Sequence, residues 1–286
     1  MAVQLHVAYS AFFKGAASIA GGAWECAKGD VNRSQSVCMI SPSQIDVKEL
    51  AQIARDRAAR GEIDDLANLA ASRVAIFASP NDMVIKPLGS DKLEEFYATF
   101  LPKSAISRLT NRSAAHGFPT LAYGNKCSTM GVPWILNCND DVAGKLLAAI
   151  EPSNRTLAAR GTADPTSIIY FDQSKLVSAQ ARMFEWGAAY IPKVCARPGA
   201  NCGVHVALHG CQMNPDFIQE EFVEHAGYNE WAESNNLVIL YPQSAKGVGN
   251  PYACWDWFGF TGSNYTTKSG EQIAGIKKIL ADLGAK

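Results

Sequence analysis

Apolar runs of strand length alternate along the chain with segments in which apolar residues recur every three or four positions. The short runs predict buried strands, and the periodic segments predict helices that pack on a sheet. Turn-forming residues follow three of the runs, among them Ser79-Pro80-Asn81-Asp82 and His209-Gly210-Cys211. The expected strands are residues 16–20, 73–77, 205–208 and 237–241. This alternation predicts an α/β fold with a mostly parallel sheet and helices on both faces.

Four segments carry a helical pattern. Leu50 and Ala54 share one face of the second segment, and Leu93 and Phe96 share a face of the third. The expected helices are residues 1–13, 47–60, 91–101 and 270–283. Residues 187–192 are expected as an extended segment at the edge of the sheet. The sequence shows no internal repeat, so residues 1–286 are predicted to form a single domain.

The net charge of the chain limits the kinds of molecule that it is expected to bind. Lys plus Arg number 26 and Asp plus Glu 27, which gives a net charge of -1. This balance argues against nucleic acid or an anionic membrane as the partner and favours an uncharged one. No apolar run approaches the roughly 18 residues that a membrane-spanning helix needs, so membrane insertion is not expected. The first 13 residues lack the basic start of a signal peptide and contain Gln4 and His6.

Eight cysteines indicate a disulfide framework. Three pairs lie close together in the sequence and leave a fourth, long-range pair. The expected pairs are Cys26 with Cys38, Cys127 with Cys138, Cys195 with Cys202, and Cys211 with Cys254. Buried free thiols are the alternative, whereas the spacing and the lack of clustered histidines argue against a metal site. Disulfides predict an extracellular or periplasmic protein, and no cofactor is indicated.

Two polar residues in turns and loops suggest an acid–base pair. Asp82 comes after the expected strand 73–77, at the end of the strand where open α/β sheets place their sites. His116 follows in a loop with glycine and proline after it. An acid and then a histidine match the second and third members of a Ser, Asp, His triad in hydrolase order. Taken alone, each residue is more simply an exposed turn aspartate or a loop histidine.

The sequence His209-Gly210-Cys211 follows another expected strand. In hydrolases a strand that ends in His-Gly supplies a backbone N–H to the oxyanion hole, which makes Cys211 the candidate donor. Trp255 and Trp257 flank Asp256 next to Cys254, so a bridge from Cys211 to Cys254 would place their rings beside this loop. We expect them to form a substrate-binding platform, although clustered tryptophans more often belong to a core.

The chain resembles the polyhydroxybutyrate depolymerase and related esterase family over nearly its whole length. The resemblance rests on these segments: residues 1–5, 20–26, 116–120, 204–212, 227–232, 239–243 and 254–257. It implies an α/β-hydrolase that cleaves an ester, with Asp82 and His116 in the triad and the Cys211 amide in the oxyanion hole. The expected substrate is a polyester or a short hydroxyalkanoate oligomer. The four cysteine pairs agree with that family.

The order of the motifs implies the circularly permuted branch of the fold. In ordinary hydrolases the His-Gly strand precedes the nucleophile, but here it lies near the C-terminus. In the family the Gly-x-Ser-x-Gly turn lies immediately before the helix matched by residues 1–9, and this sequence contains no such motif. Ser10, Ser41 and Ser43 lack that turn and are not expected to replace the missing serine.

The sequence therefore predicts a hydrolase fold without its nucleophile strand, truncated at the N-terminus and inactive in this form. A split sheet is expected, with residues 205–208 and 16–20 unpaired with each other, together with poor solubility or a molten character. Two alternatives stay open. One is a non-catalytic homologue that binds polyester or an oligomer, and the other is an esterase for a different hydrophobic or aromatic acyl ester.

Overall fold

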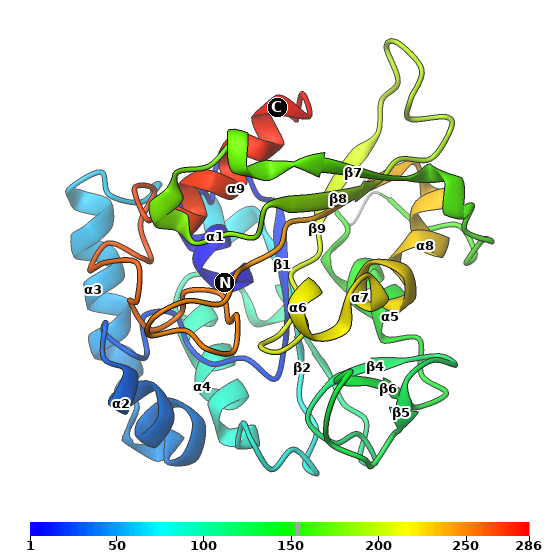
Figure 1. Cartoon of the computed structure of the whole chain (residues 1–286). Helices are drawn as coiled ribbons and strands as arrows, with labels where there is room; N and C mark the ends of the chain where they lie inside the picture. Colours follow the sequence, from blue (N-terminus) through cyan, green and yellow to red (C-terminus); the bar gives the residue numbers. More distant parts are fainter. Residues whose placement is uncertain (153–154, 286) are drawn as a thin grey trace.

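The computed structural model describes residues 1–152 and 155–285. Its strands form two larger sheets and one small sheet, with helices packed around them (Figure 1). The first sheet has the order β1-β2-β3 and is wholly parallel. Its strands are β1 (Gly15–Ile19), β2 (Arg73–Phe77) and β3 (Ile106–Leu109). Val74, Ala75, Ile76 and Phe77 are all buried, as expected for a strand covered on both faces.

The second sheet has the order β7-β8-β10-β9. Its strands are β7 (Ile168–Asp172), β8 (Trp186–Tyr190), β9 (Gly203–Val206) and β10 (Leu237–Tyr241). β10 pairs in parallel with β9, whereas the contacts of β8 with β10 and with β7 are antiparallel. The sheets are thus parallel except at β7 and β8, and the α/β class expected from the sequence is confirmed.

Residues 187–192 do not form a sheet edge, so that prediction was wrong. β8 lies between β7 and β10, and Ala188, Ala189 and Tyr190 are fully buried. The strand at this edge of the sheet is instead β7, where Ile169 and Tyr170 are about half exposed, at 45% and 48%. β8 lies between two neighbours because its backbone pairs with both β7 and β10, a tertiary property that its own sequence does not encode.

Most predicted helices are present, but the first ends at Ala8 and not at residue 13, because the backbone of Tyr9 leaves helical geometry (φ -123°, ψ 51°); the prediction of a helix over residues 9–13 was wrong. The longer ones are α1 (Ala2–Ala8), α3 (Val47–Ala59), α4 (Pro87–Tyr97), α5 (Val142–Ile150), α8 (Tyr228–Asn235) and α9 (Glu271–Asp282). Short helices are α2 (Val31–Arg33), α6 (Pro215–Ile218) and α7 (Glu221–His225). Asp46 caps α3 by accepting hydrogen bonds from two backbone N–H groups. α4 starts four residues earlier than expected because Pro87 is favoured in the first turn.

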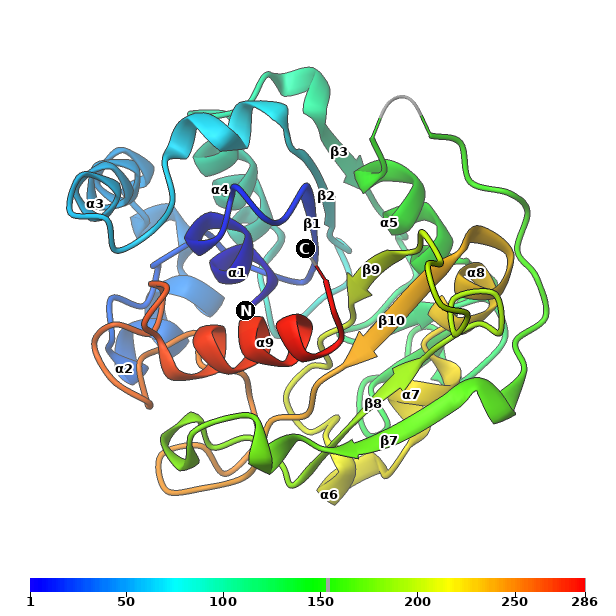
Figure 2. The same cartoon turned by 90° about the horizontal axis from the view of Figure 1, so that it is seen from above.

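Helices cover both faces of the sheets. Figure 2 shows α1, α4 and α9 on one side of the strands and α5 and α8 on the other. α1 contacts β1, α5 contacts β1 and β2, and α8 contacts β10. The small parallel sheet is not hydrogen-bonded to the other two, but its β4 contacts α5. It contains β4 (Phe118–Thr120), β5 (Asn125–Lys126) and β6 (Ile135–Asn137), in the order β4-β6-β5.

The two larger sheets do not join. Among the described residues β1 pairs only with β2, and β9 pairs only with β10. Residues 15–20 and 203–211 line opposite parts of a cavity of about 1880 Å³, together with the start of α1. The split sheet expected from the sequence is therefore present, and the two facing edges leave backbone groups without strand partners.

Candidate active site

Asp82 lies in the loop after β2, at the carboxyl end of that strand. Its carboxylate is buried, and Oδ1 accepts the backbone N–H groups of Val84 and Ile85, each at 2.8 Å. This local turn is the usual way in which an aspartate side chain fixes its own loop. Because Oδ1 of Asp82 is used in this turn, Oδ2 is available to accept a hydrogen bond from another loop.

His116 is that partner. Its Nδ1 lies 2.8 Å from Oδ2 of Asp82. Since a carboxylate can only accept, Nδ1 carries the proton and Nε2 is the atom able to take one. The His116 side chain is 27% exposed and lines the cavity. Gly117 is required beside it, because a Cβ there would lie 2.7 Å from the carbonyl oxygen of Trp134.

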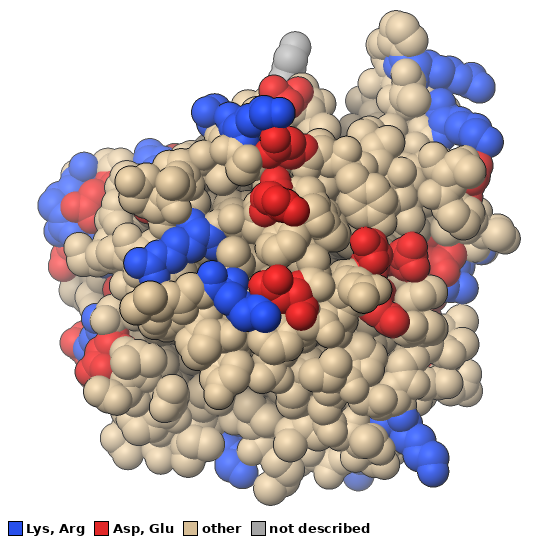
Figure 3. Space-filling view, viewed as in Figure 1, with Lys and Arg blue, Asp and Glu red and all other residues tan. Residues whose placement is uncertain are grey.

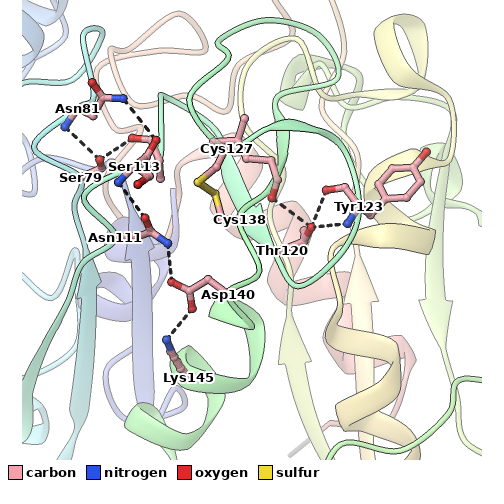
Figure 4. Close-up of a disulfide and its surroundings, with 12 residues drawn as sticks. Ser79, Asn81, Asn111, Ser113, Thr120, Tyr123, Cys127, Cys138, Asp140 and Lys145 are labelled. Atoms are coloured by element: carbon pink, nitrogen blue, oxygen red, sulfur yellow. Dashed lines mark hydrogen bonds and ion pairs between the residues drawn. A yellow bond between two sulfur atoms is a disulfide. The ribbon is translucent and has the colours of Figure 1, made fainter.

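Figure 4 shows how the two loops are tied together. Ser79 Oγ donates to the carbonyl oxygen of Ala114 at 2.5 Å, and Asn81 Nδ2 donates to that of Ser113 at 3.4 Å. The amide of Ala115 donates to the carbonyl of Cys127, which is bridged to Cys138. These hydrogen bonds and the disulfide join residues within 79–138, and Asn111 Nδ2 also donates to Asp140 at 2.9 Å, just beyond that range.

Cys211 lies on the opposite wall of the cavity, in the loop after β9. It is bridged to Cys254, with the two Cα atoms 4.2 Å apart. In the described part of the chain the Cys211 amide donates no hydrogen bond, whereas the next amide, of Gln212, donates to the carbonyl of Tyr252 at 2.7 Å. The structure thus brings an unpaired N–H group and the Asp82–His116 pair to one cavity.

Two residues that the sequence analysis missed connect these walls. Trp134 Nε1 donates to Oε1 of Gln212 at 3.1 Å, and its ring lies edge-on to His116 with centroids 5.9 Å apart. Both Trp134 and Gln212 have left-handed backbone conformations, at φ 60° and 58°. Such strain in non-glycine residues clusters at functional sites. A sequence pattern gives no signal for a contact between residues 78 positions apart.

The tryptophans predicted as a platform differ in exposure. Trp255 is 4% exposed and packs in the core beside His209, with ring centroids 5.3 Å apart. Trp257 is partly buried against the same core. Both line the cavity, so their rings can contribute to its apolar wall.

A second serine–histidine contact is present, but it lies away from this pair. Ser244 Oγ is 3.3 Å from His209 Nε2 and donates to the carbonyl of Ala253 at 2.5 Å. Ser244 is fully buried, so a substrate cannot reach it. Ser18 and Ser34 line the cavity, yet neither is hydrogen-bonded to His116 within the described residues.

The four predicted disulfides are confirmed: Cys26–Cys38, Cys127–Cys138, Cys195–Cys202 and Cys211–Cys254. Among the described residues, no cluster of three or more His, Cys, Asp or Glu side chains is arranged to hold a metal ion. No helix in the same part of the chain has the length and apolar character to cross a bilayer.

Known proteins resemble the chain closely. A poly(3-hydroxybutyrate) depolymerase of Delftia acidovorans is 42% identical over 98% of this chain, which spans only 56% of that relative. The chain thus spans little more than half the length of this curated relative. A polyhydroxybutyrate depolymerase of Talaromyces funiculosus is 34% identical over 96% of this chain and 84% of its own length. No family model matches the chain.

Two solved structures share the fold over 97% of this chain, each at 32% identity. One is a PHB depolymerase from Penicillium funiculosum, with a TM-score of 0.87 and 91% of that chain covered. The other is a PHB depolymerase with a serine replaced by alanine, in complex with an R3HB trimer, with a TM-score of 0.88 and 90% covered. From the identity to the Talaromyces relative and its coverage, the chain belongs to the polyhydroxybutyrate depolymerase family.

Proposed function

We propose that the chain is the acid–base part of a serine ester hydrolase that acts on poly(3-hydroxybutyrate) or its short oligomers. The observation that carries this proposal is the Asp82–His116 hydrogen bond of 2.8 Å at the wall of a large cavity, with the unpaired Cys211 amide on the facing wall. A relative of known structure was captured with an R3HB trimer, which supports the choice of substrate.

Each of these residues has its own role in the proposed reaction. His116 Nε2 takes the proton of a serine hydroxyl as the serine oxygen bonds to the ester carbonyl carbon, while Asp82 holds the imidazole and stabilises its charged form. The Cys211 N–H stabilises the negative charge that develops on the carbonyl oxygen. His116 then gives the proton to the leaving alcohol, and water releases the acyl group by the same route. No step requires a cofactor.

We also propose that the serine lies on a strand outside these 286 residues, which fills the space between β1 and β9. The sequence has no Gly-x-Ser-x-Gly motif, and two strand edges face each other across the cavity. A strand needs about 4.8 Å on each side to pair with its neighbours. With it, the sheet becomes continuous and matches a circularly permuted α/β-hydrolase. Without it, the chain has no nucleophile and is inactive.

The loops around the cavity favour an uncharged, apolar substrate. Met83, Val248 and Tyr252 are exposed by 65%, 91% and 55%, and they lie in or beside loops that line the cavity. The lower central part of the face in Figure 3 shows few charged side chains. Exposed apolar side chains beside a cavity support binding of an apolar partner. An ester of another hydrophobic or aromatic acid is the runner-up substrate.

The four disulfides support an oxidising compartment. We therefore propose an extracellular or periplasmic location, where a polymeric substrate too large to enter a cell would be met.

The experiment joins a strand with a Gly-x-Ser-x-Gly segment from a relative to the N-terminus. Hydrolysis of p-nitrophenyl butyrate and of R3HB trimer is then measured for this extended chain, for the 286-residue chain, and for serine→Ala and His116→Ala variants of the extended chain. We expect activity in the extended chain alone. Binding of the trimer without hydrolysis in the extended chain would favour a non-catalytic binding protein, and activity that survives both alanine variants would contradict the residue assignment.

A further inference from the structure

We propose that His209 is a positioning residue that orients the peptide group between Gly210 and Cys211, and so directs the Cys211 N–H into the cavity. The inference rests on the proposed function, because it concerns the oxyanion donor of that reaction. Its physical basis is the orientation of a single peptide plane, which the contacts of a buried histidine determine.

The hydrogen bonds of His209 define its tautomer. The backbone N–H of Ser244 donates to Nε2 at 3.1 Å, so Nε2 carries no proton. Nδ1 therefore carries it and donates to the carbonyl oxygen of Gly210 at 2.7 Å. Burial lowers the pKa of His209 to about 4, which keeps the ring neutral and this tautomer in place at neutral pH.

The carbonyl direction determines the amide direction. In a trans peptide the C=O and the following N–H lie in one plane and point in opposite directions. The carbonyl of Gly210 points at the His209 ring, so the N–H of Cys211 points away from it. In the described residues this N–H has no protein partner, and Gly210 and Cys211 both line the cavity.

Other contacts also hold this loop, but the bond from His209 is the shortest one to the Gly210 carbonyl. The bridge to Cys254 fixes the Cys211 side chain, and the amide of Gln212 is held by Tyr252. The Gly210 carbonyl also accepts the amide of Met213, at a longer distance of 3.3 Å. Glycine at position 210 has no side chain to resist rotation of the plane. Among the described side chains, His209 is thus the one that bonds to this carbonyl.

His209 also links this peptide to the next strand. Ser244 follows β10, and its hydroxyl donates to the carbonyl of Ala253, one residue before the bridged Cys254. The contact between His209 and Ser244 therefore connects the ends of β9 and β10 with the bridged loop. This arrangement explains why a fully buried Ser–His contact exists here without a nucleophilic role.

Two matched variants separate the two contacts of the ring. His209→Asn places an amide near the position of Nδ1 and can still donate to Gly210, whereas His209→Gln places its amide nearer to Nε2 and loses that bond. In the extended chain we expect His209→Gln to lower kcat by tenfold or more, towards the ~100-fold cost of losing an oxyanion donor, with KM little changed. His209→Asn should lose less than His209→Gln. Equal losses in both, or a change in KM alone, would overturn the inference.

A second measurement does not depend on activity. Crystal structures of the two variants should show the Gly210 carbonyl rotated in His209→Gln and retained in His209→Asn; an unrotated carbonyl in both contradicts the inference. If both variants fail to fold, nitrogen-15 NMR of the unaltered protein decides, because a proton on Nε2 of His209 would also contradict it. Lack of hydrolysis by the extended chain would refute the proposed function and leave these structural outcomes decisive for His209.

Discussion

The two walls of the cavity are held in different ways. Around Asp82 and His116, the named supports lie within residues 79–138, apart from the bond of Trp134 to Gln212, and consist of turns, loop hydrogen bonds and one disulfide of 11-residue separation. Around Cys211, the supports join residues far apart in the sequence, through Ser244 and a disulfide of 43-residue separation. The comparison indicates that the acid–base pair is organised locally, whereas the oxyanion side depends on the ends of β9 and β10 staying together.

The largest expected effect concerns the acid–base wall. In the extended chain, His116→Ala should lower kcat by about 10⁶-fold and Asp82→Asn by about 10⁴-fold, as for other triads. Asn at position 82 keeps an oxygen that can accept the amides of Val84 and Ile85, and the hydrogen bonds of Ser79 and Asn81 involve neither Asp82 nor His116, so thermal unfolding should change little. Steady-state kinetics and calorimetry on the same samples check both statements. A large loss of stability without loss of kcat would show that Asp82 and His116 stabilise the fold and do not act in catalysis.

Acid should affect the buried histidines next. Burial lowers the pKa of His6 and of His209 from 6.5 to about 4. The unfolded chain takes up these protons below pH 6.5 and the folded chain does not, so stability is full above pH 6.5 and falls as the pH drops towards 4. Each histidine can contribute up to about 3 kcal/mol to this loss.

Denaturant unfolding between pH 7 and pH 4 measures this dependence. His209→Asn should remove the contribution of His209 to the fall in stability with pH. His6→Gln should remove the contribution of His6. A pH dependence that is the same in both variants and in the unaltered protein would assign the loss to other groups, namely His205, whose pKa burial also lowers to about 4, or carboxylates.

The disulfides offer a smaller, matched comparison. Replacing Cys211 and Cys254 by serine opens a long loop and should cost about 4 kcal/mol, whereas replacing Cys195 and Cys202 opens a short loop and should cost about 2 kcal/mol. Urea unfolding of both double variants measures the difference. If the two double variants lose equal free energy of unfolding, then the long-range bridge does not support the oxyanion wall in the way we describe.

The smallest expected effect is at the link between the walls. Trp134→Phe removes the hydrogen bond to Gln212 and keeps the aromatic contact with His116. One neutral hydrogen bond contributes about 1 kcal/mol, so kcat/KM of the extended chain should fall roughly fivefold. An unchanged kcat/KM would show that the two walls are positioned independently of each other.

Much of the fold could be predicted because local patterns define it. The bounds of β2 and β10 agree with the predicted ranges, and α3 and α9 differ by only a residue at an end. β9 covers residues 203–206 and not the predicted 205–208, because its register is set by pairing with residues 237–240 of β10. Pairing partners are a tertiary property, which a single segment does not encode.

The candidate site, like the fold, could be predicted where local sequence determines it and not where it depends on tertiary contacts. Asp82 and His116 were predictable because each follows a strand or lies in a loop with a known residue order, and their contact is present. The roles of Trp134 and Gln212 were not, because they arise from a contact between two loops. The tautomer of His209 likewise depends on Ser244, 35 residues further along the chain. The prediction that the 286-residue chain is poorly soluble or molten stays a prediction.

The central claim is that Asp82 and His116 serve a serine that lies outside these 286 residues, on a strand between β1 and β9. A fluorophosphonate, which reacts with activated serines, tests it directly when followed by mass spectrometry. We expect no label on the 286-residue chain and one label per molecule on the added serine of the extended chain, lost in His116→Ala. Stoichiometric labelling of any serine among the 286 residues would contradict the account.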